Sequence, residues 1–426
     1  MPEPATPEGP DVVVVGQGYV GLPVALRAAR VGRRVLGFDL DKDRVDKLRR
    51  GESFVDDVTD ADLRTVIADG RFRAGDDAAE LAGFGTAVVC VPTPLRDGAP
   101  DLRHIESAAR LLAPHVTPGC CVVLESTTYP GTTEEVFAPI LEAGSGLRAG
   151  PDFHLGYSPE RIDPTNPRFG LVNTPKIVSG VDEASVRVVR AFYDQLVDET
   201  VLAGTVREAE LAKLLENTFR HVNIALVNEL AIYCHELGID VWSVIDMAAT
   251  KPFGFMRFTP GPGVGGHCLP IDPSYLSWQV RRALGRTFRF VEIANDVNDN
   301  MPGYVVARVA EHLNRRRLAV NGSRILLAGL TYKRNSGDAR SSPAIVVARR
   351  LHALGADLRA VDPFLTAADV PEGVELVPGD AEQVAAADLV VVLTDHDELD
   401  WELLGSVPEH VLDTRNRLRG PAVDRL

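Results

Sequence analysis

Short apolar runs alternate with turn residues over the first two hundred positions of the chain. Residues 11–39 read DVVVVGQGYVGLPVALRAARVGRRVLGFD: a β-branched run, a glycine turn, an Ala/Leu/Arg segment and a second apolar run that ends in an acid. This order predicts a βαβ unit. The runs TAVVCVPTP (86–94) and CVVLEST (121–127) have the composition of strands buried on both faces. The region therefore predicts an open parallel α/β sheet.

The pattern changes at Thr205. Residues 205–238 carry apolar side chains at helical spacing and end in Gly238, a typical helix stop. A helix of that length in a soluble protein usually bridges domains or builds a dimer interface. A loop rich in Gly and Pro follows at 251–273, and a second α/β pattern begins at Arg324.

These patterns predict the fold class α/β, with two Rossmann-like parallel-sheet domains joined by a central helical domain that contains one long helix. The expected domains are 1–204, 205–315 and 316–426. A chain of 426 residues is too long for one hydrophobic core, so a division of this kind is expected.

Composition narrows the partners. The chain is 45% hydrophobic and 25% charged, which is typical of a folded soluble protein. Its net charge of −15 disfavours a nucleic-acid or anionic-membrane partner. A spanning apolar run and a signal peptide are both missing from the sequence, so we expect a cytoplasmic protein. Five scattered cysteines indicate reduced thiols, and their spacing does not predict a zinc or other metal site.

A glycine motif stands between the first predicted strand and helix. Gly16, Gly18 and Gly21 form G-x-G-x-x-G where the backbone N–H groups of a helix start would hold a dinucleotide pyrophosphate. Asp39 closes the second strand, where an acid can bind a ribose 2′-hydroxyl and would repel a 2′-phosphate. This favours NAD over NADP. The alternative is a turn whose glycines only allow close helix–strand packing.

A cysteine follows a second glycine-rich stretch. Residues 261–270 read GPGVGGHCLP, so Cys268 comes directly after a backbone that can approach a ligand closely. Alone, it would be a small buried apolar residue. Asp272 lies four residues on, and Lys213 and Asn217 are four apart on the long helix, so both project from one face. A thiolate nucleophile with a nearby oxyanion-stabilising lysine is the functional interpretation.

Together, motifs along nearly the whole chain resemble the nucleotide-sugar 6-dehydrogenase family, which contains the UDP-glucose, UDP-N-acetylhexosamine and GDP-mannose dehydrogenases. The motifs are Gly16-x-Gly18-x-x-Gly21, Val91-Pro-Thr-Pro94, Glu125-Ser-Thr-Thr-Tyr-Pro-Gly131, Ser158-Pro-Glu-Arg-Ile-Asp-Pro164, Lys213-Leu-Leu-Glu-Asn217, GPGVGGHCLPIDP, Gly329-Leu-Thr-Tyr-Lys333 and Asp338-x-Arg340-x-Ser-Pro343.

The resemblance implies roles for individual residues. Cys268 matches the family's nucleophile, Lys213 and Asn217 its oxyanion-stabilising pair. The other implied catalytic residues are Asp272, Thr127 and Glu160. The implied cofactor contacts are Gly16, Gly18, Tyr19, Val20, Gly21, Asp39, Pro92, Thr93, Thr127 and Arg340. The implied substrate contacts are Glu160, Arg161, Lys213, Asn217, Arg257, Gly265, Lys333 and Arg415.

The same resemblance implies the partners. The substrate would be a nucleotide-diphosphate sugar, NAD the cofactor, and the protein a homodimer formed through the long helix. A basic residue of one subunit, Arg257 or Lys251, would reach the sugar site of the other. The domains 1–204 and 316–426 would bind NAD and the nucleotide sugar, and 205–315 would carry the cysteine loop and the dimer contacts.

The residues within the motifs near the expected substrate site favour one branch of the family. Several UDP-glucose members have a glutamate where this chain has Pro164, whereas Ser158-Pro-Glu-Arg-Ile-Asp-Pro164, Glu125-Ser-Thr and His267 resemble the UDP-N-acetylhexosamine branch. The hexose (glucose, N-acetylglucosamine or N-acetylmannosamine) and the base (UDP, dTDP or GDP) stay open.

The expected reaction is a four-electron oxidation of a C6 alcohol to the uronate, through a thiohemiacetal and a thioester on Cys268. One alternative is a single-step 3-hydroxyacid or 6-phosphogluconate-type dehydrogenase, which has no need of the thiol. The other is a non-catalytic nucleotide-sugar-binding protein, which would be expected to have lost Cys268 or Lys213; both are present.

Overall fold

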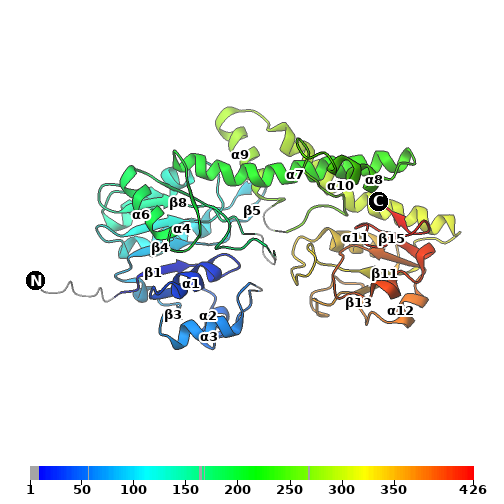
Figure 1. The fold of residues 1–426 in the computed structure, drawn as a ribbon, viewed down its shortest axis with the longest axis horizontal. Helices are drawn as coiled ribbons and strands as arrows, with labels where there is room; N and C mark the ends of the chain where they lie inside the picture. The colour runs from blue at the N-terminus through cyan, green and yellow to red at the C-terminus, as the bar shows by residue number, and fades with distance from the viewer. Residues whose placement is uncertain (1–8, 56, 163–165, 167, 267–268) are drawn as a thin grey trace, which may run out of the picture. The chain divides into compact units, whose positions relative to one another are not determined.

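The computed structural model describes residues 9–426 except 56, 163–165, 167, 267 and 268. The chain forms two compact units, residues 1–216 and 217–426, and each is described separately (Figure 1). Each unit contains a sheet with helices against both faces, which confirms the predicted α/β class. The predicted boundaries at 204/205 and 315/316 stay a prediction.

The first unit is built on an eight-stranded sheet of the described residues, in the order β10-β9-β8-β7-β4-β1-β2-β3. Its strands are β1 (Val12–Val15), β2 (Val35–Phe38), β3 (Phe72–Gly75), β4 (Thr86–Val89), β7 (Cys121–Leu124), β8 (His154–Tyr157), β9 (Lys176–Gly180) and β10 (Thr200–Leu202). A small hairpin, β5 (Leu95–Arg96) and β6 (Ala99–Pro100), follows β4.

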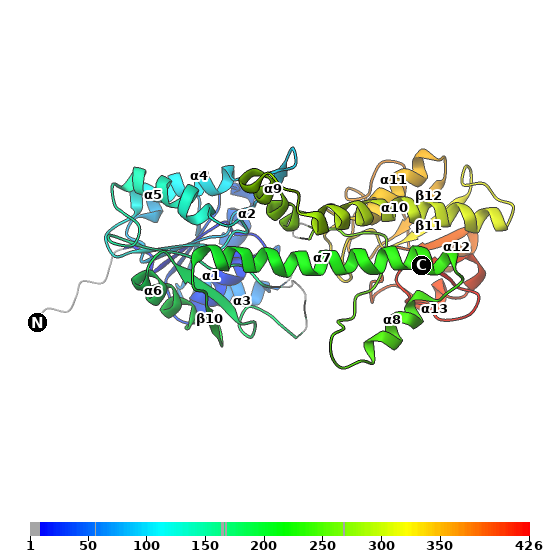
Figure 2. The same ribbon diagram turned by 90° about the horizontal axis from the view of Figure 1, so that it is seen from above.

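Helices cover both faces of this sheet, as Figure 2 shows. They are α1 (Gly21–Arg30), α2 (Lys42–Arg49), α3 (Asp60–Ala68), α4 (Arg103–Leu112), α5 (Ala138–Ser145) and α6 (Glu183–Tyr193). The valines of β1 explain the arrangement, because successive side chains of a strand point to opposite faces. Val12 and Val14 pack with α1, α3 and α6, whereas Val13 and Val15 pack with α4 and α5.

One edge of the first sheet departs from the prediction. Six neighbouring strands, in the order β3-β2-β1-β4-β7-β8, run parallel. The next strand, β9, pairs antiparallel with β8, and β10 runs parallel to β9. The predicted parallel α/β sheet is present, and the reversal at β9 is a feature that the sequence analysis did not predict. Because β9 is reversed, its first residue, Lys176, lies at the edge where β7 and β8 end.

The long helix α7 (Val206–Glu236) crosses the boundary between the two units. It ends before Gly238, whose φ of +69° is a backbone conformation that glycine adopts without strain. Both the predicted helix and its predicted stop are confirmed. The helices that follow are α8 (Val241–Ala249), α9 (Asp272–Leu284) and α10 (Arg289–Arg315).

The second sheet has six parallel strands among the described residues, in the order β13-β12-β11-β14-β15-β16. They are β11 (Arg324–Ala328), β12 (Asp357–Val361), β13 (Val374–Leu376), β14 (Leu389–Val392), β15 (Val411–Asp413) and β16 (Asp424–Arg425). Helices α10 and α11 (Pro343–Ala353) cover one face, and α12 (Ala381–Ala386) and α13 (Trp401–Leu404) the other. The second α/β pattern predicted from Arg324 onward is confirmed.

A buried glutamate joins α7 to the loop after β7. Both Glu210 carboxylate oxygens accept hydrogen bonds, one from Gly131 N–H (2.6 Å) and the other from the N–H (2.9 Å) and hydroxyl (2.7 Å) of Thr133. The side chain is fully buried, and this burial raises the pKa of Glu210 to about 7. The loop at 126–133, which carries Thr127, is thereby fixed to the helix that carries Lys213.

The raised pKa predicts a pH dependence of stability. The folded state binds the Glu210 proton more tightly than the unfolded state does, so this proton's contribution is complete below the ordinary glutamate pKa and is lost as the pH rises through about 7. In Glu210→Gln no such titration occurs. The difference in unfolding free energy between wild type and variant should therefore fall between pH 5 and 7, by up to about 1.4 kcal/mol per pH unit, and level off above pH 8.

Urea unfolding followed by circular dichroism at pH 5, 6, 7 and 8 measures this difference. Glu229→Gln, on the exposed side of the same helix, is the matched control. A Glu210→Gln difference that is the same at all four pH values would contradict the raised pKa.

Candidate active site

The turn between β1 and α1 distinguishes a ligand-binding glycine motif from a packing motif. A Cβ on Gly16, whose φ is +91°, would lie 2.5 Å from the carbonyl oxygen of Cys90, and one on Gly21 would lie 1.8 Å from that of Gly16. Those two glycines are required by packing. A Cβ on Gly18 meets no described heavy atom within 4 Å, so packing does not explain this glycine. Open space there fits a pyrophosphate that approaches the backbone.

Asp39 is held against the same turn. One oxygen of its carboxylate accepts from Gln17 N–H (2.8 Å) and from the Arg44 guanidinium (3.0 Å), and the other from Asp41 N–H (3.0 Å). The carboxylate therefore lies at the end of β2 beside the glycine turn, where a ribose 2′-hydroxyl would bind. The sequence analysis did not single out Arg44, which lies on α2 five residues after Asp39 and binds its carboxylate.

The other predicted cofactor contacts of this unit lie on neighbouring loops. Tyr19 and Val20 directly precede α1, and Pro92 and Thr93 follow β4, the strand beside β1. The chain order passes from β1 to β2 and β3 on one side and to β4 and β7 on the other, so this is the switch point where doubly wound sheets bind ligands. The residues present thus fit NAD.

Thr127 lies on the loop after β7. The preceding residue, Ser126, donates a hydrogen bond from its hydroxyl to the carbonyl oxygen of Val91 at 2.8 Å. This bond ties the loops after β7 and β4 together. Thr127, half-buried, is therefore next to the segment that contains Pro92 and Thr93.

Glu160 and Lys213 are both buried in the first unit. Burial raises the pKa of Glu160, while the Lys176 and Lys213 ammonium groups lower it and Glu125 raises it further. One oxygen of the Glu160 carboxylate accepts from Ile162 N–H. The structure thus brings two predicted catalytic residues, Glu160 and Lys213, close enough to interact electrostatically.

Arg161 has protein partners. Its guanidinium pairs with Glu216 at 2.7 Å and donates to the carbonyl oxygen of Pro175 at 2.5 Å. A substrate contact by this side chain stays a prediction, and it would have to coexist with or displace these bonds.

In the second unit, Asn217 donates from its amide to a carboxylate oxygen of Asp272 at 2.5 Å. Asp272 is buried at the first turn of α9, and Asn217 lies on α7 four residues after Lys213. Two of the predicted catalytic residues are therefore in contact. Cys268, the predicted nucleophile, and His267 lie outside the described residues.

Buried amides hold the start of the glycine loop. The Asn228 side chain accepts from Gly261 N–H (2.9 Å) and donates to Asn298 on α10 (2.9 Å). Nearby, His221 pairs with Asn295 at 2.8 Å, and burial lowers the pKa of this histidine. The sequence analysis missed this network, because a polar residue in a helical pattern is normally assigned to the solvent face.

The rest of the described loop packs against motifs of the last domain. A Cβ on Gly265 would lie 2.7 Å from both Tyr332 Cβ and the Ser341 carbonyl oxygen. A Cβ on Gly266, with φ +87°, would lie 2.7 Å from the Tyr332 ring. A side chain is therefore excluded at Gly265 by packing, and its predicted substrate contact could only be made by its backbone.

The predicted cations of the last domain differ in their surroundings. Arg415 is partly buried, donates to the Leu393 carbonyl oxygen at 2.7 Å, and faces Gly261, where a Cβ would lie 2.7 Å from its guanidinium. Burial lowers the pKa of Arg415. Arg340 is exposed and forms a two-bond pair with Asp338 (2.9 and 2.8 Å), and Lys333 is half-buried. Arg415 therefore lies against the start of the glycine loop.

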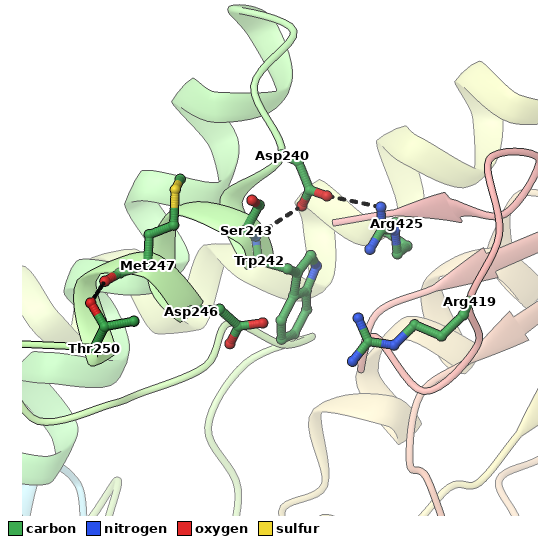
Figure 3. Close-up of a pocket in the computed structure, with 8 residues that line it drawn as sticks. All are labelled: Asp240, Trp242, Ser243, Asp246, Met247, Thr250, Arg419 and Arg425. Carbon is green, nitrogen blue, oxygen red and sulfur yellow. Dashed lines mark hydrogen bonds and ion pairs between the residues drawn. The ribbon is translucent and has the colours of Figure 1, made fainter.

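Arg257 lies beside a different feature. It pairs with Asp246 at 2.8 Å, and Lys251 lies over the Phe253 ring at 4.9 Å. Asp246 also lines a pocket of about 390 Å³ between α8 and the C-terminal segment (Figure 3). The pocket is lined by Asp240, Trp242, Ser243, Asp246, Met247, Thr250, Arg419 and Arg425. None of these is a predicted catalytic residue, so the pocket is not the candidate active site.

The described part of the chain contains no group of three or more His, Cys, Asp or Glu side chains placed to hold a metal ion. None of its helices is long and apolar enough to cross a membrane.

Family models match most of the chain in the order of the fold. Residues 10–197 match the NAD binding domain of the UDP-glucose/GDP-mannose dehydrogenase family, residues 207–300 its central domain and residues 326–420 its UDP binding domain. The resemblance inferred from the motifs is therefore confirmed.

Full-length relatives agree. The chain is 34% identical over 418 residues to UDP-N-acetyl-D-mannosamine dehydrogenase of Pyrococcus horikoshii, covering 97% of each chain. It is 35% identical over 389 residues to UDP-N-acetyl-D-glucosamine 6-dehydrogenase of Pseudomonas aeruginosa, covering 91% of this chain and 90% of the relative.

Solved structures match over similar lengths. A structure of the Pyrococcus horikoshii enzyme, described as a UDP-D-ManNAc dehydrogenase, superposes with a TM-score of 0.88 over 97% of each chain, at 34% identity. A UDP-glucose dehydrogenase of Pyrobaculum islandicum superposes with a TM-score of 0.85 at 26% identity, over 99% of this chain and 98% of the other. The chain therefore belongs to the UDP-glucose/GDP-mannose dehydrogenase family and is an NAD-dependent nucleotide-sugar dehydrogenase.

Proposed function

We propose that this enzyme oxidises the C6 alcohol of a UDP-N-acetylhexosamine to the carboxylate in two steps through a covalent adduct on Cys268. The observation that carries the two-step chemistry is the bond between Asn217 and Asp272, at the end of the loop that contains the cysteine. The motif wording and the names of the full-length relatives support an N-acetylhexosamine substrate.

NAD, when bound, accepts the hydride in each oxidation. The first oxidation converts the C6 alcohol to an aldehyde, and the Cys268 thiolate then adds to the aldehyde carbon. The resulting oxyanion needs preorganised donors, which Lys213 and Asn217 supply from α7. Loss of a second hydride from the thiohemiacetal gives a thioester.

Hydrolysis of the thioester needs groups that exchange protons. Water adds to the acyl carbon, the thiolate leaves, and the product is a carboxylate. Asp272 and Glu160 are the buried carboxyl groups that we assign to this step. Burial raises the pKa of Glu160, which favours a carboxyl that can take up and release a proton. Thr127 contacts the reacting sugar and the cofactor.

The diphosphate of the substrate needs cations, although the chain is acidic. Lys333 and Arg415 would supply them from the domain at 316–426, and Arg340 would reach the cofactor. Arg161, Arg257 and the Gly265 backbone complete the proposed contacts. The close approach of Arg415 to Gly261 supports this assignment, because a substrate bound to Arg415 would lie next to the loop that contains the cysteine.

We also propose a homodimer formed along α7. One stripe of this helix and the turn after it is apolar and solvent-exposed: Leu211, Leu215, Phe219, Leu226, Tyr233 and Leu237. The spacings of four and seven residues put these side chains on one face. A continuous apolar stripe on a helix favours burial against a second copy. Arg257 or Lys251 remains the candidate for the residue that crosses to the partner.

The reaction can be tested by its stoichiometry. With NAD and a panel of UDP-, dTDP- and GDP-hexoses, the enzyme should release two NADH per sugar from a UDP-N-acetylhexosamine, with little free aldehyde. Cys268→Ala cannot form the adduct, so uronate production should fall by orders of magnitude. Uronate formation by Cys268→Ala at the wild-type rate would exclude the covalent mechanism.

Cofactor choice can be tested at Asp39. Asp39→Ala removes the ribose acceptor and releases the Arg44 guanidinium, which can then bind a 2′-phosphate. The ratio of kcat/KM for NAD over NADP should fall about tenfold or more, because a hydrogen bond to a charged group contributes about 1.5–3 kcal/mol. Asp39→Ala/Arg44→Ala should recover part of the ratio. An unchanged ratio in Asp39→Ala would exclude the ribose assignment.

The dimer can be tested by light scattering. Wild type should have twice the 46.0 kDa mass of the chain, and Leu226→Glu, which puts a charge in the middle of the apolar stripe, should shift the mass to 46.0 kDa. Leu354→Glu, an exposed leucine outside the stripe, is the control. A wild-type monomer, or an undisturbed Leu215→Glu/Leu226→Glu dimer, would exclude an interface on this face.

A further inference from the structure

A cluster of buried polar side chains lies at the carboxyl edge of the first sheet. Cys90 follows β4, Glu125 follows β7, and Ser158 follows β8. Lys176 joins them from the start of β9, because that strand runs antiparallel to β8. Glu125, Ser158 and Lys176 are almost fully buried.

Glu125 and Lys176 form an ion pair. The Lys176 ammonium lies 3.0 Å from one carboxylate oxygen of Glu125, and the hydroxyl of Tyr193 donates to the same carboxylate. The thiol of Cys90 lies 3.6 Å from the other oxygen. The ammonium also lies over the Tyr193 ring, 5.2 Å from its centroid. Burial raises the pKa of the Cys90 thiol and of the Tyr193 hydroxyl, so both remain neutral donors to Glu125.

Lys176 also reaches the segment that carries Glu160. Its ammonium donates to the carbonyl oxygen of Pro159 at 3.1 Å. In the ladder of β8 and β9, Gly156 pairs with Gly180 and Tyr157 with Ser179. Beyond this ladder, the Ser158 hydroxyl donates to the carbonyl oxygen of Ile177 at 2.7 Å, so the segment after β8 stays beside the start of β9. Lys176 therefore contacts the backbone next to Glu160, and its ammonium is close enough to lower the pKa of that carboxyl.

Glu160 itself is half satisfied. One carboxyl oxygen accepts from Ile162 N–H, but the other is buried and has no hydrogen-bond partner among the described residues. A buried polar atom without a partner destabilises the folded protein. Such a group is expected where a ligand or a reacting water supplies the missing bond.

Stability alone does not account for the Lys176–Glu125 pair. Desolvation of two ions costs about as much as their attraction returns, and apolar residues of similar volume are often as stable. The pair is instead placed where it can act on a third ionisable group. Among the described residues of the first unit, the charged side chains that act on Glu160 are Lys176 from β9, Glu125 from the end of β7 and Lys213 from α7, and the neutral Cys90 and Tyr193 contact Glu125.

We propose that the buried Lys176–Glu125 pair is a positioning element for Glu160: it fixes the Ser158–Pro159–Glu160 segment and sets the local charge against which the Glu160 carboxyl gains and loses its proton. The inference rests on the proposed role of Glu160 in thioester hydrolysis. Lys176 favours the carboxylate and Glu125 the carboxylic acid, and because they form one pair, their effects on Glu160 oppose each other.

Because the two charges act in opposite directions, removing each one should shift the midpoint for protonation of Glu160 in the opposite direction. In Lys176→Met the midpoint for protonation of Glu160 should rise by about one pH unit or more, because an opposite charge within about 4–6 Å lowers a carboxyl pKa by 1–3 units. In Glu125→Gln it should fall, and in the double variant it should return close to the wild-type value. Lys176→Arg, which keeps the charge, should stay closest to wild type among the single variants.

Two readouts on the full-length enzyme measure the midpoint. The first is a pH titration by NMR of protein labelled with 13C at glutamate Cδ, in which the Glu160 signal is the one missing from Glu160→Gln. The second is the acidic limb of kcat for uronate formation, with KM for NAD expected to be unchanged. Lys47→Met, an exposed lysine on α2, is the control.

Opposite shifts in the two single variants support the proposal, since a purely structural pair would lower activity without moving the midpoint in opposite directions. Shifts of the same sign, or none beyond the Lys47→Met control, overturn it. If Lys176→Met does not fold, Glu125→Gln and the double variant decide by the same criterion, and failure of all three to fold would assign the pair a structural role and overturn the proposal.

The two proposals fail separately. If wild type oxidises no nucleotide sugar to a uronate, the proposed function fails and the NMR midpoints still judge the Lys176–Glu125 pair. If wild type releases two NADH per sugar but the midpoints do not move, only the proposal for the pair fails.

Discussion

Parallel strands deliver their carboxyl ends to one edge of a sheet, and most of the candidate site in the first unit depends on this constraint. The glycine turn follows β1, Asp39 follows β2, Pro92 and Thr93 follow β4, and Thr127 follows β7. The side chains of these strands fill the two hydrophobic cores, so few of them could contact a ligand. The polar residues that could act on a ligand therefore lie mostly in the loops that follow the strands.

The same constraint explains what the sequence could predict. The βαβ start, the strands at Thr86–Val89 and Cys121–Leu124, and α7 are encoded by local apolar patterns, and they are present as predicted. The direction of β9 is not encoded locally. It depends on pairing with β8, and such pairing leaves no mark in the local apolar pattern, so the sequence could not predict that Lys176 would reach the edge with Glu125.

Buried polar residues in helices are the second feature that the sequence analysis did not predict. Glu210, His221 and Asn228 lie on α7, where a 3.6-residue pattern assigns polar residues to solvent. Their partners are Gly131, Thr133, Asn295, Gly261 and Asn298, all distant in sequence. The helix is thus amphipathic in a reversed sense at these positions: polar groups face inward to hold loops, and the leucines of the outer stripe face solvent. Motif resemblance located Lys213 and Asn217 but could not locate the residues that orient the loops around them.

Helix geometry links these observations. Glu210 and Lys213 are three residues apart on α7, and Lys213 and Asn217 are four residues apart. Each pair therefore lies side by side on the surface of the helix. Glu210 fixes the loop that carries Thr127, Lys213 acts on Glu160, and Asn217 binds Asp272. The first two of these contacts lie in the first unit, so the spacing of Glu210 and Lys213 along α7 relates the loop of Thr127 to Glu160. The proposed oxyanion role of Lys213 needs a side chain whose position is fixed before the substrate binds, and a residue inside a 31-residue helix meets that need because the backbone on both sides of it is hydrogen-bonded.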